Sequence, residues 1–360
     1  MDKHIIYHVP FKLNPDAKSA SGIRPLKMLE AFKSIGFIVD VIEGNAKERK
    51  KKIKEIKRNI EDGKSYAFCY SESSTQPTLH TEPYAFIKHP FFEFDFFKFL
   101  KRHGIKIGLF YRDIYWCFSE NVDTYKKKFY KLLYEYDLYQ YNKLVDTLFV
   151  PSKEMMEYVN NPKSYRIEEL PSGTIIYKHD NQKINDKKGR IEFIYVGGIG
   201  NHYNLTLFLE VIKKFPNLHL TLCCRKDEWE KVYQSYVPFL SENVDIIHTS
   251  GENLKDLLRN ADIGLLFVEP TEYRKFAMPY KLMEFLGYGL PILSSTRTKT
   301  SEFVTNNKCG WAVEYDEVSL QLFLSKLDRK TIYDTQNNVI DFAPSQTWEA
   351  RAKKVAQILG

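Results

Sequence analysis

Short apolar runs alternate with amphipathic stretches along the whole chain. Between the runs, apolar residues recur at helical spacing, as at Leu26, Leu29 and Phe32. Strands that alternate with helices are typical of parallel sheets covered by helices, so the pattern predicts an α/β protein. The predicted strands are residues 5–9, 37–42, 66–70, 105–111 and 146–150 in the first half, and residues 191–196, 218–223, 244–248, 261–268 and 290–293 in the second.

Chain length and one polar stretch predict two domains. With 360 residues the chain is too long for one typical domain and sufficient for two. Residues 178–190 are mostly polar and have the composition of a linker. We expect an N-terminal domain over residues 1–176 and a C-terminal domain over residues 177–345. A terminal helix over residues 346–360 has Trp348, Ala352, Val355 and Leu359 on its apolar side.

Positive charge is concentrated in the first half of the chain. The net charge is +7, and residues 1–176 hold 29 Lys and Arg against 23 Asp and Glu, whereas the remainder holds 24 against 23. Much of the excess lies in residues 47–60 and 125–134. These stretches are either solvated helix faces or surfaces that attract an anionic membrane or acceptor. Nucleic acid is not expected as a partner, because the sequence has no recognised nucleic-acid-binding motif.

The cysteines and the first residues predict a cytoplasmic protein. The five cysteines have neither metal-ligand spacing nor the pattern of a disulfide framework. The first apolar run is short and is interrupted by His8 and Pro10, unlike that of a signal peptide. No run approaches the length of a transmembrane helix. We therefore expect reduced cysteines, no metal and no cofactor.

Residues 279–295, PYKLMEFLGYGLPILSS, are the most distinctive stretch of the chain. Pro279 suits the first turn of a helix, and two glycines end that helix before a short buried strand. Lys281 and Glu284 are three residues apart, so they share one face of the helix near its N-terminus. That face is either a surface ion pair or a ligand site. In a ligand site, the cation and the helix N-terminus would bind phosphate and the carboxylate would bind hydroxyl groups.

A second candidate for phosphate binding follows the strand at residues 191–196. Gly197-Gly198-Ile199-Gly200 stands between this strand and a helix predicted from about residue 203, where small residues let backbone amides approach a ligand. The spacing does not fit the dinucleotide fingerprint, so NAD is not indicated. The sequence also contains neither a P-loop nor a nucleophile elbow, which disfavours kinases, ATPases and serine hydrolases.

Two candidate sites in the first half lie at predicted loop positions. Ser21-Gly22 stands just before a helix predicted from about Pro25, where loop amides can approach an anionic ligand, although most such glycines only make a turn. Arg112-Asp113 directly follows the strand at residues 105–111, at the edge where open α/β sheets bind ligands. This Arg-Asp pair is either a simple ion pair or a set of ligand contacts.

The pattern P-x-K-x-x-E-x-x-x-x-G-x-P at residues 279–291 resembles the donor-binding motif of GT-B glycosyltransferases, most closely the bacterial enzymes of glycosyltransferase family 4. The resemblance implies the GT-B fold, an α/β architecture of two Rossmann-like parallel-sheet domains that face a cleft. It implies that the C-terminal domain binds the nucleotide-sugar donor and the N-terminal domain binds the acceptor. Lys281 would contact the diphosphate and Glu284 the ribose, and these two residues with Asp113 form the expected catalytic set.

Weaker similarities along the rest of the chain extend the expected site. The donor-binding set is Gly197, Gly198, Gly200, Arg225, His248, Ala277, Met278, Lys281 and Glu284. The acceptor- or sugar-binding set is Ser21, Gly22, Arg24, Arg112 and Asp113. Asp113 would be the general base if the reaction inverts the anomeric configuration, since that mechanism needs a carboxylate at the acceptor hydroxyl.

The chain departs from the family pattern at two places in the donor site. Many members carry a glutamate where this chain has Phe276, so the contact with the donor sugar is absent or is replaced by Glu269 or Glu272. Asn201 and His202 follow the glycine-rich loop in place of the usual cation, and Arg225 is the expected substitute. Arg274 and Lys275 are either exposed charges or further phosphate contacts.

The resemblance implies a metal-independent hexosyl- or related glycosyltransferase. It would move a sugar, with retention, from a nucleotide diphosphate to a hydroxyl of a lipid-linked saccharide in bacterial surface polysaccharide assembly. We expect it in the cytoplasm, either free or peripheral at the inner face of the membrane. The absence of a D-x-D motif from the sequence argues against a metal-chelated nucleotide. Two alternatives stay open: a GT-B sugar-nucleotide epimerase, and a catalytically silent nucleotide-sugar-binding or partner protein.

Overall fold

The structure, a computed structural model, describes residues 4–17, 19–81, 91–118, 124–159, 165–177, 189–200 and 203–360. The chain divides into two compact units, one of Met1–Gly173 with Trp348–Gly360 and one of Thr174–Thr347. The terminal segment therefore belongs to the first unit. Most of the expected linker, residues 178–188, lies outside the described residues, as do Asn201 and His202.

The described part of the first unit contains a six-stranded parallel sheet in the order β2-β1-β3-β4-β5-β6. The five strands predicted for this half are confirmed. β6 was not predicted, because its residues RIEE contain no apolar run and lie half-exposed at the sheet edge. The strands are β1 (His4–His8), β2 (Ile38–Ile42), β3 (Cys69–Glu72), β4 (Ile107–Phe110), β5 (Thr147–Val150) and β6 (Arg166–Glu169).

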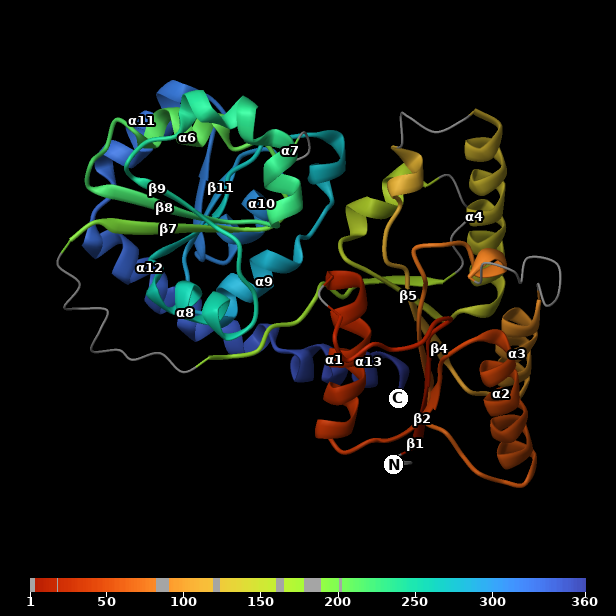
Figure 1. The fold of residues 1–360 in the computed structure, drawn as a ribbon. Coiled ribbons are helices and arrows are strands. Elements are labelled where there is room, and N and C mark those ends of the chain that lie inside the picture. Colours follow the sequence, from red (N-terminus) through yellow and green to blue (C-terminus); the bar gives the residue numbers. More distant parts are fainter. Residues whose placement is uncertain are drawn as a thin grey trace. The chain divides into compact units, whose positions relative to one another are not determined.

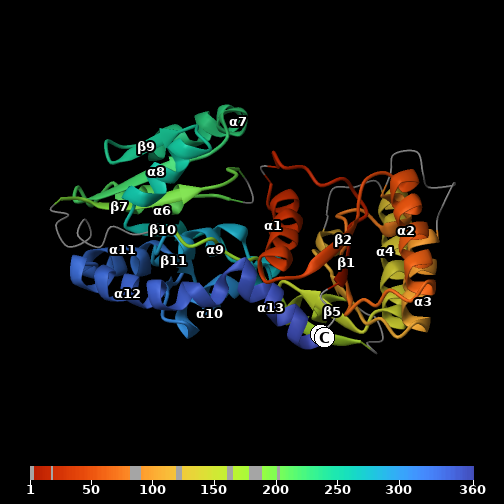
Figure 2. The same ribbon diagram turned by 90° about the horizontal axis from the view of Figure 1, so that it is seen from below.

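Helices cover both faces of this first sheet (Figure 1). Figure 2 shows α1 and the terminal helix α13 on the side opposite to α2, α3 and α4. The apolar side predicted for the terminal helix is confirmed, since Trp348, Ala352, Val355 and Leu359 are all buried. The helices are α1 (Ala20–Ser34), α2 (Ala46–Glu61), α3 (Phe92–Arg102), α4 (Thr124–Leu144) and α13 (Trp348–Leu359), with short 3₁₀ helices η1 (Thr78–His80), η2 (Tyr115–Cys117) and η3 (Lys153–Tyr158).

The predicted start of the first helix is wrong. α1 begins at Ala20, so Ser21 and Gly22 lie in its first turn and Pro25 lies inside the helix. Proline has no N–H and cannot bond to the carbonyl four residues earlier, here that of Ser21. The Ser21 carbonyl instead accepts a hydrogen bond from Nη1 of Arg112 at 2.5 Å. A side chain from the segment after β4 thus satisfies the carbonyl that the proline leaves unpaired, which sequence periodicity cannot foresee.

The described part of the second unit contains another six-stranded parallel sheet, in the order β12-β11-β10-β7-β8-β9. The strands predicted for this half are confirmed as β7 (Ile191–Val196), β8 (Leu218–Cys223), β9 (Val244–Ile247), β10 (Ile263–Leu266) and β11 (Ile292–Ser295). The edge strand β12 (Gly310–Val313) was not predicted. Two parallel sheets with interleaved helices confirm the predicted α/β fold class.

Two apolar cores lie on opposite faces of the second sheet. One buries side chains of α6, α7 and α11 against the strands, and the other buries side chains of α8, α9 and α10. The helices are α6 (Thr206–Ile212), α7 (Lys226–Tyr236), α8 (Glu252–Asn260), α9 (Tyr280–Gly287), α10 (Lys299–Asn306), α11 (Glu317–Lys326) and α12 (Arg329–Phe342). The short 3₁₀ helices are η4 (Val237–Phe239), η5 (Glu272–Lys275) and η6 (Ala343–Gln346).

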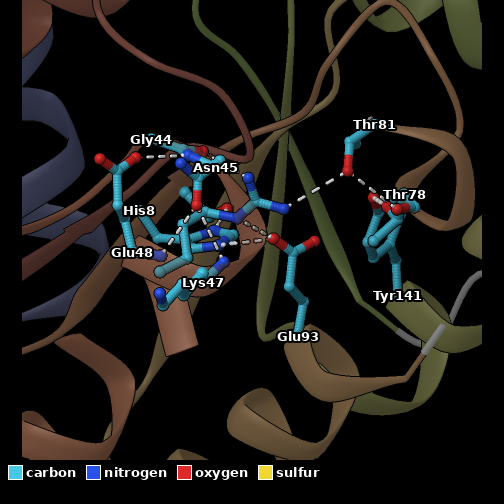
Figure 3. Close-up of polar contacts among 11 residues, drawn as sticks. His8, Gly44, Asn45, Lys47, Glu48, Thr78, Thr81, Glu93 and Tyr141 are labelled. Carbon is cyan, nitrogen blue, oxygen red and sulfur yellow. Dashed lines mark hydrogen bonds and ion pairs between the residues drawn. The ribbon is translucent and has the colours of Figure 1, made fainter. Parts of the chain in front are cut away.

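A buried polar network joins the helices of the first unit to its sheet (Figure 3). Nε of Arg49 lies 2.9 Å from Oε1 of Glu93, and Nε2 of His8 lies 3.4 Å from the same oxygen. All three side chains are at least 96% buried. Nη1 of Arg49 also donates to the Gly44 carbonyl at 2.5 Å. Because removal of either charge would leave the other buried and unpaired, this network fixes α2 and α3 against β1.

Candidate functional site

The carboxyl ends of neighbouring strands meet at one edge of the second sheet. β7 lies in its interior, and the strand order runs outward from β7 to β9 on one side and to β12 on the other. At such a switch point the loops after adjacent strands diverge, and open α/β sheets bind their ligands there. The loops after β7, β8 and β9, and the segment from β10 to α9, are therefore placed to form a binding site.

The glycine-rich loop after β7 is held at this edge by β8. The amide of Gly197 donates to the carbonyl of Cys223 at 3.1 Å. Gly200 has a φ of +135°, which side-chain-bearing residues rarely adopt. A Cβ atom at Gly198 would lie 3.3 Å from Oε2 of Glu228. Gly200 therefore lies where the loop turns, and Gly198 lies where the carboxylate of Glu228 approaches the loop.

Glu228, which sequence reasoning did not single out, shows what kind of group this loop accommodates. Its Oε2 accepts from the amide of Ile199 at 3.3 Å, and its Oε1 pairs with Nη1 of Arg225. A carboxylate held by a loop amide and an arginine has the same partners that a phosphate oxygen would use. Arg225 thus lies close to the loop, as a substitute cation would, although its side chain is 68% exposed and engaged by Glu228.

Lys281 and Glu284 form an ion pair on the first turns of α9 and are 26% and 21% exposed. Burial raises the pKa of the Cys223 thiol, and the charge of Lys281 lowers it while that of Glu284 raises it. Both charged side chains are therefore close to Cys223 at the end of β8. The carbonyl of Cys223 accepts the hydrogen bond from the amide of Gly197. The structure brings the two distinctive sequence patterns to one place, 80 residues apart in the chain.

His248 follows β9 and lies at the same sheet edge. Its Nδ1 is 2.9 Å from the carbonyl of Cys224, which follows β8. Ala277 and Met278 precede α9, and the amide of Ala277 donates to the carbonyl of Tyr273 at 3.1 Å. Met278 is half-buried and packs against the core beneath α9.

Phe276 occupies the position at which many relatives carry a glutamate, and it is 2% exposed. Its ring packs edge-on against Tyr273, with centroids 5.0 Å apart. Glu272 is paired with Lys275, and its side chain is 61% exposed. Glu269 is exposed and raises the pKa of Tyr315, so it lies near that tyrosine. The apolar side chain of Phe276 thus occupies the position of the expected glutamate. That Glu269 or Glu272 replaces this glutamate stays a prediction.

Arg274, which the sequence left as either an exposed charge or a phosphate contact, lies near the glycine-rich loop. Its guanidinium lies 5.1 Å from the ring centroid of Tyr203, and the Tyr203 amide donates to the carbonyl of Gly200 at 2.9 Å. Burial lowers the pKa of Arg274, while nearby Tyr203 and Tyr195 raise it. The Tyr195 hydroxyl donates to the carbonyl of Gly198 at 2.6 Å. Arg274 therefore lies among tyrosines that contact both ends of the glycine-rich loop.

In the first unit, three of the predicted acceptor-site residues line one pocket. Ser21, Gly22 and Arg112 contribute to a pocket of about 390 Å³ at the carboxyl edge of the first sheet. A Cβ atom on Gly22 would lie 2.6 Å from Cβ of Ala17, so only glycine lets the loop and α1 approach this closely.

Arg24 and Asp113, the other two residues predicted for the acceptor site, are not among the residues that line this pocket. Arg24 is 4% exposed and lies with its guanidinium 3.4 Å from the ring centroid of Phe110 and its Nε 3.4 Å from Oε1 of Glu72. Oδ1 of Asp113 accepts from the amides of Ile114 and Tyr115 at 2.6 and 2.9 Å, so this carboxylate caps the turn η2. Arg112 pairs with Glu72, with Nη2 and Oε2 3.5 Å apart. The assigned roles of Asp113 and Arg24 in binding stay predictions.

Part of the second unit matches the model of a known protein family. Residues 177–322 match the family model of glycosyl transferases group 1. This range includes the glycine-rich loop, Arg225, Arg274 and the helix that carries Lys281 and Glu284. None of the curated proteins that were compared matches the sequence significantly.

Solved structures with the same fold extend over nearly the whole chain. Sucrose-phosphate synthase from Thermosynechococcus elongatus is similar with a TM-score of 0.66 at 13% identity, covering 99% of this chain and 98% of that one. HepE from Anabaena, solved with UDP and glucose, has a TM-score of 0.64 at 11% identity and covers 98% of each chain. WaaG, a glycosyltransferase involved in lipopolysaccharide biosynthesis, has a TM-score of 0.57 at 13% identity, covering 98% of this chain and 99% of that one.

These matches confirm the predicted GT-B fold, and the group 1 match agrees with the resemblance to glycosyltransferases seen in the donor motif. The structural similarity is to the fold of both units, and the family match is to the part of the chain where the donor motif lies. The chain has the fold of the GT-B glycosyltransferases, and the greater part of its second unit matches the glycosyl transferases group 1 family.

Proposed function

We propose that the protein is a glycosyltransferase that takes a sugar from a nucleotide diphosphate donor bound by the second unit. One observation carries the proposal: the glycine-rich loop, Arg225, Arg274, Lys281 and Glu284 converge on the switch-point edge of a sheet within the region matched by the family model. Three cations and a loop that accommodates a carboxylate suit a diphosphate. Glu284 suits the ribose hydroxyls. HepE, which shares the fold, was solved with UDP and with UDP-glucose.

The chemistry of such a transfer depends on the leaving diphosphate. The bond from the anomeric carbon to the diphosphate breaks while an acceptor hydroxyl adds to that carbon and loses its proton. Negative charge grows on the diphosphate, and fixed cations and amides stabilise it without reorganising. In this protein Lys281, Arg225, Arg274 and the amides of the Gly197–Gly200 loop are the groups that would do so. We propose that the reaction retains the anomeric configuration and needs no metal.

A thermal-shift screen tests the donor site. UDP, GDP, ADP, CMP and dTDP are compared first, and then their common sugar conjugates. A ligand at about 100 times its Kd should stabilise the protein by about 2.7 kcal/mol, which is readily visible as a rise in Tm. One responding nucleotide supports the proposal and limits the donor to a few sugars. No response to any nucleotide would refute it.

A catalytically silent nucleotide-sugar-binding protein is the second candidate. The observation that favours it is Phe276, a buried aromatic residue at the position of a polar ligand in many relatives. Release of nucleoside diphosphate from the responding nucleotide-sugar, in the presence of candidate acceptors, separates the two. Turnover would exclude a catalytically silent protein. Tight donor binding without turnover with any acceptor would support one.

We further propose that the acceptor is a lipid-linked saccharide reached at an anionic membrane surface. No helix in the described part of the chain is long and apolar enough to cross a membrane. α4 nevertheless carries a second apolar stripe, on which Tyr125, Phe129, Leu132 and Tyr139 are 84%, 43%, 63% and 49% exposed. The exposed Lys128 and Lys131 lie on the same helix. Aromatic and cationic side chains together favour the interface of an anionic bilayer.

Sedimentation with lipid vesicles tests the role of α4. The protein should bind phosphatidylglycerol vesicles more strongly than phosphatidylcholine vesicles, and a Phe129→Ser, Leu132→Ser variant should lose most of this binding. Val318 and Leu322 on α11 are 77% and 54% exposed, so a Val318→Ser, Leu322→Ser variant is a matched control. Equal binding by both variants would exclude the α4 stripe as the membrane contact.

A further inference from the structure

The pocket of the first unit is lined by hydroxyl groups and cations. It lies where β1, β3 and β4 end, and its walls include Ser19, Ser21, Ser74 and Thr75 together with Arg112. Lys12 adds a second cation, and among the described residues of the lining the one acidic side chain is the exposed Asp16. The lining therefore offers several hydrogen-bond donors and a net positive charge.

The N-terminus of α1 forms part of this pocket and is not capped by its own side chains. Ser19 stands at the N-cap position without a capping hydrogen bond, and its hydroxyl instead lies 3.0 Å from that of Ser21. The first turn of α1 contains no acidic residue. The partial positive charge of this 15-residue helix is thus left without a local carboxylate.

Buried charges behind the pocket are unbalanced. Arg24 and Arg112 are 4% and 11% exposed and share one buried carboxylate, that of Glu72, at 3.4 and 3.5 Å. Within the described residues, the three guanidinium nitrogens of Arg24 and the Nε and Nη2 atoms of Arg112 have no hydrogen-bond partner. Two guanidinium groups against one carboxylate leave an excess positive charge in a place that is largely closed to water.

The pKa values of Arg112 and Arg351 reflect the same excess of positive charge. Burial lowers the pKa of Arg112, and the charge of Arg24 lowers it further while Glu72 raises it. Burial and the charge of Arg24 also lower the pKa of Arg351 to about 10. Two buried guanidinium groups that share one carboxylate leave one positive charge without compensation, and an anion bound in the pocket that Arg112 lines would balance it.

We propose that this pocket binds the phosphate group of a phosphorylated saccharide, so that the acceptor of the transfer is anionic. The acceptor role rests on the proposed glycosyltransferase function, whereas phosphate binding stands on the pocket alone. Arg112 lines the pocket and offers a planar guanidinium, the hydroxyls offer neutral donors, and the end of α1 offers an uncompensated dipole. The phosphate ester comes either from a soluble sugar phosphate or from the diphosphate of a lipid-linked saccharide.

Isothermal titration calorimetry at constant ionic strength tests the proposal with defined probes. Glucose 6-phosphate should bind about tenfold or more tightly than glucose, because charged hydrogen bonds to a phosphate are stronger than neutral ones. Inorganic phosphate should compete with glucose 6-phosphate. Farnesyl diphosphate serves as the lipid-linked probe, and tighter binding of farnesyl diphosphate than of glucose 6-phosphate would favour the lipid source.

Ser21→Asp is the decisive variant, since it places a carboxylate in the pocket without disturbing the fold. An acidic residue in the first turn of a helix is favourable, so Tm should not fall. Glucose 6-phosphate binding should weaken about tenfold or more, while Ser21→Ala should bind within about threefold of the wild type. Arg112→Gln should also weaken binding, whereas Arg166→Gln, an arginine 61% exposed on β6, should not.

The outcomes separate this pocket from the donor site. Glucose 6-phosphate that binds no better than glucose, or that binds Ser21→Asp as well as the wild type, would overturn the proposal. UDP should bind all these variants equally, because the donor residues belong to the second unit. If glucose 6-phosphate binds in this way and no nucleotide binds, the phosphate pocket stands and its acceptor role fails with the proposed function.

Discussion

Lys281 gives the sharpest test of the donor site, because its structural and functional contributions differ in size. Lys281 forms an ion pair with Glu284 in which the two side chains are 26% and 21% exposed. Pairs this close to solvent contribute less than about 1 kcal/mol to stability. A charge-assisted hydrogen bond to a phosphate oxygen contributes about 1.5–3 kcal/mol, which corresponds to about 10- to 150-fold in Kd. Lys281→Ala should therefore weaken diphosphate binding far more than it destabilises the fold.

Calorimetric titration of UDP, or of whichever nucleotide the thermal-shift screen identifies, and of its nucleoside measures this difference. We expect a loss of about 10- to 150-fold for the diphosphate and less than about twofold for the nucleoside, since only the diphosphate reaches the lysine. Lys27→Ala is the matched control: Lys27 and Glu30 on α1 form a pair with the same order and spacing, and Lys27 is 32% exposed. Lys27→Ala should leave both affinities unchanged.

Two results would refute the reasoning. An equal loss for diphosphate and nucleoside would show that Lys281 does not act on the phosphates. A fall in stability much greater than that of Lys27→Ala would show that the pair with Glu284 holds α9 in place, so that lost binding reflects altered structure.

Three further perturbations have expected outcomes. Glu284→Ala should weaken diphosphate and nucleoside to a similar degree, since both carry the ribose; an unchanged affinity for both would remove Glu284 from the site. Arg274→Gln should weaken diphosphate binding about 5- to 20-fold and leave nucleoside binding unchanged, and a titration with no difference would remove Arg274 from the site. Asp137 is 3% exposed, and burial raises its pKa from 3.8 to about 8, so the folded protein holds a proton that the unfolded chain releases. This contribution to stability is fully present below about pH 4 and is lost as pH rises towards 8, at up to about 1.4 kcal/mol per pH unit. Urea unfolding of wild type and Asp137→Asn at pH 5–8 should show this slope in the wild type alone, and parallel curves would contradict it.

The local patterns of the sequence were sufficient for most of the fold. Buried parallel strands are apolar along their length, so the central strands of both sheets could be located from runs such as residues 191–196. The edge strand β6 lacks such a run, because its side chains are partly exposed and mostly charged, and the four-residue edge strand β12 is also partly exposed. The helix after Pro279 could be predicted because its start, its apolar face and its glycine stop all lie within a few residues of one another.

Contacts between distant residues could not be predicted in this way. Pro25 signals a helix start by itself, and it lies inside α1 because Arg112, 87 residues later in the chain, takes the carbonyl of Ser21. Arg274 was one of two charges in an exposed-looking loop until the fold placed it beside Tyr203.

The sequence by itself determined the fold class, the order of the elements and the motif around Lys281 and Glu284, because these depend on neighbours a few residues apart. Only the tertiary structure decided which charges meet. It placed the Lys281–Glu284 pair beside β8, brought Glu228 onto the glycine-rich loop, and buried Arg24 and Arg112 around the single carboxylate of Glu72. Electrostatic interaction depends on distance in space and on burial, and neither quantity can be read from separation along the chain.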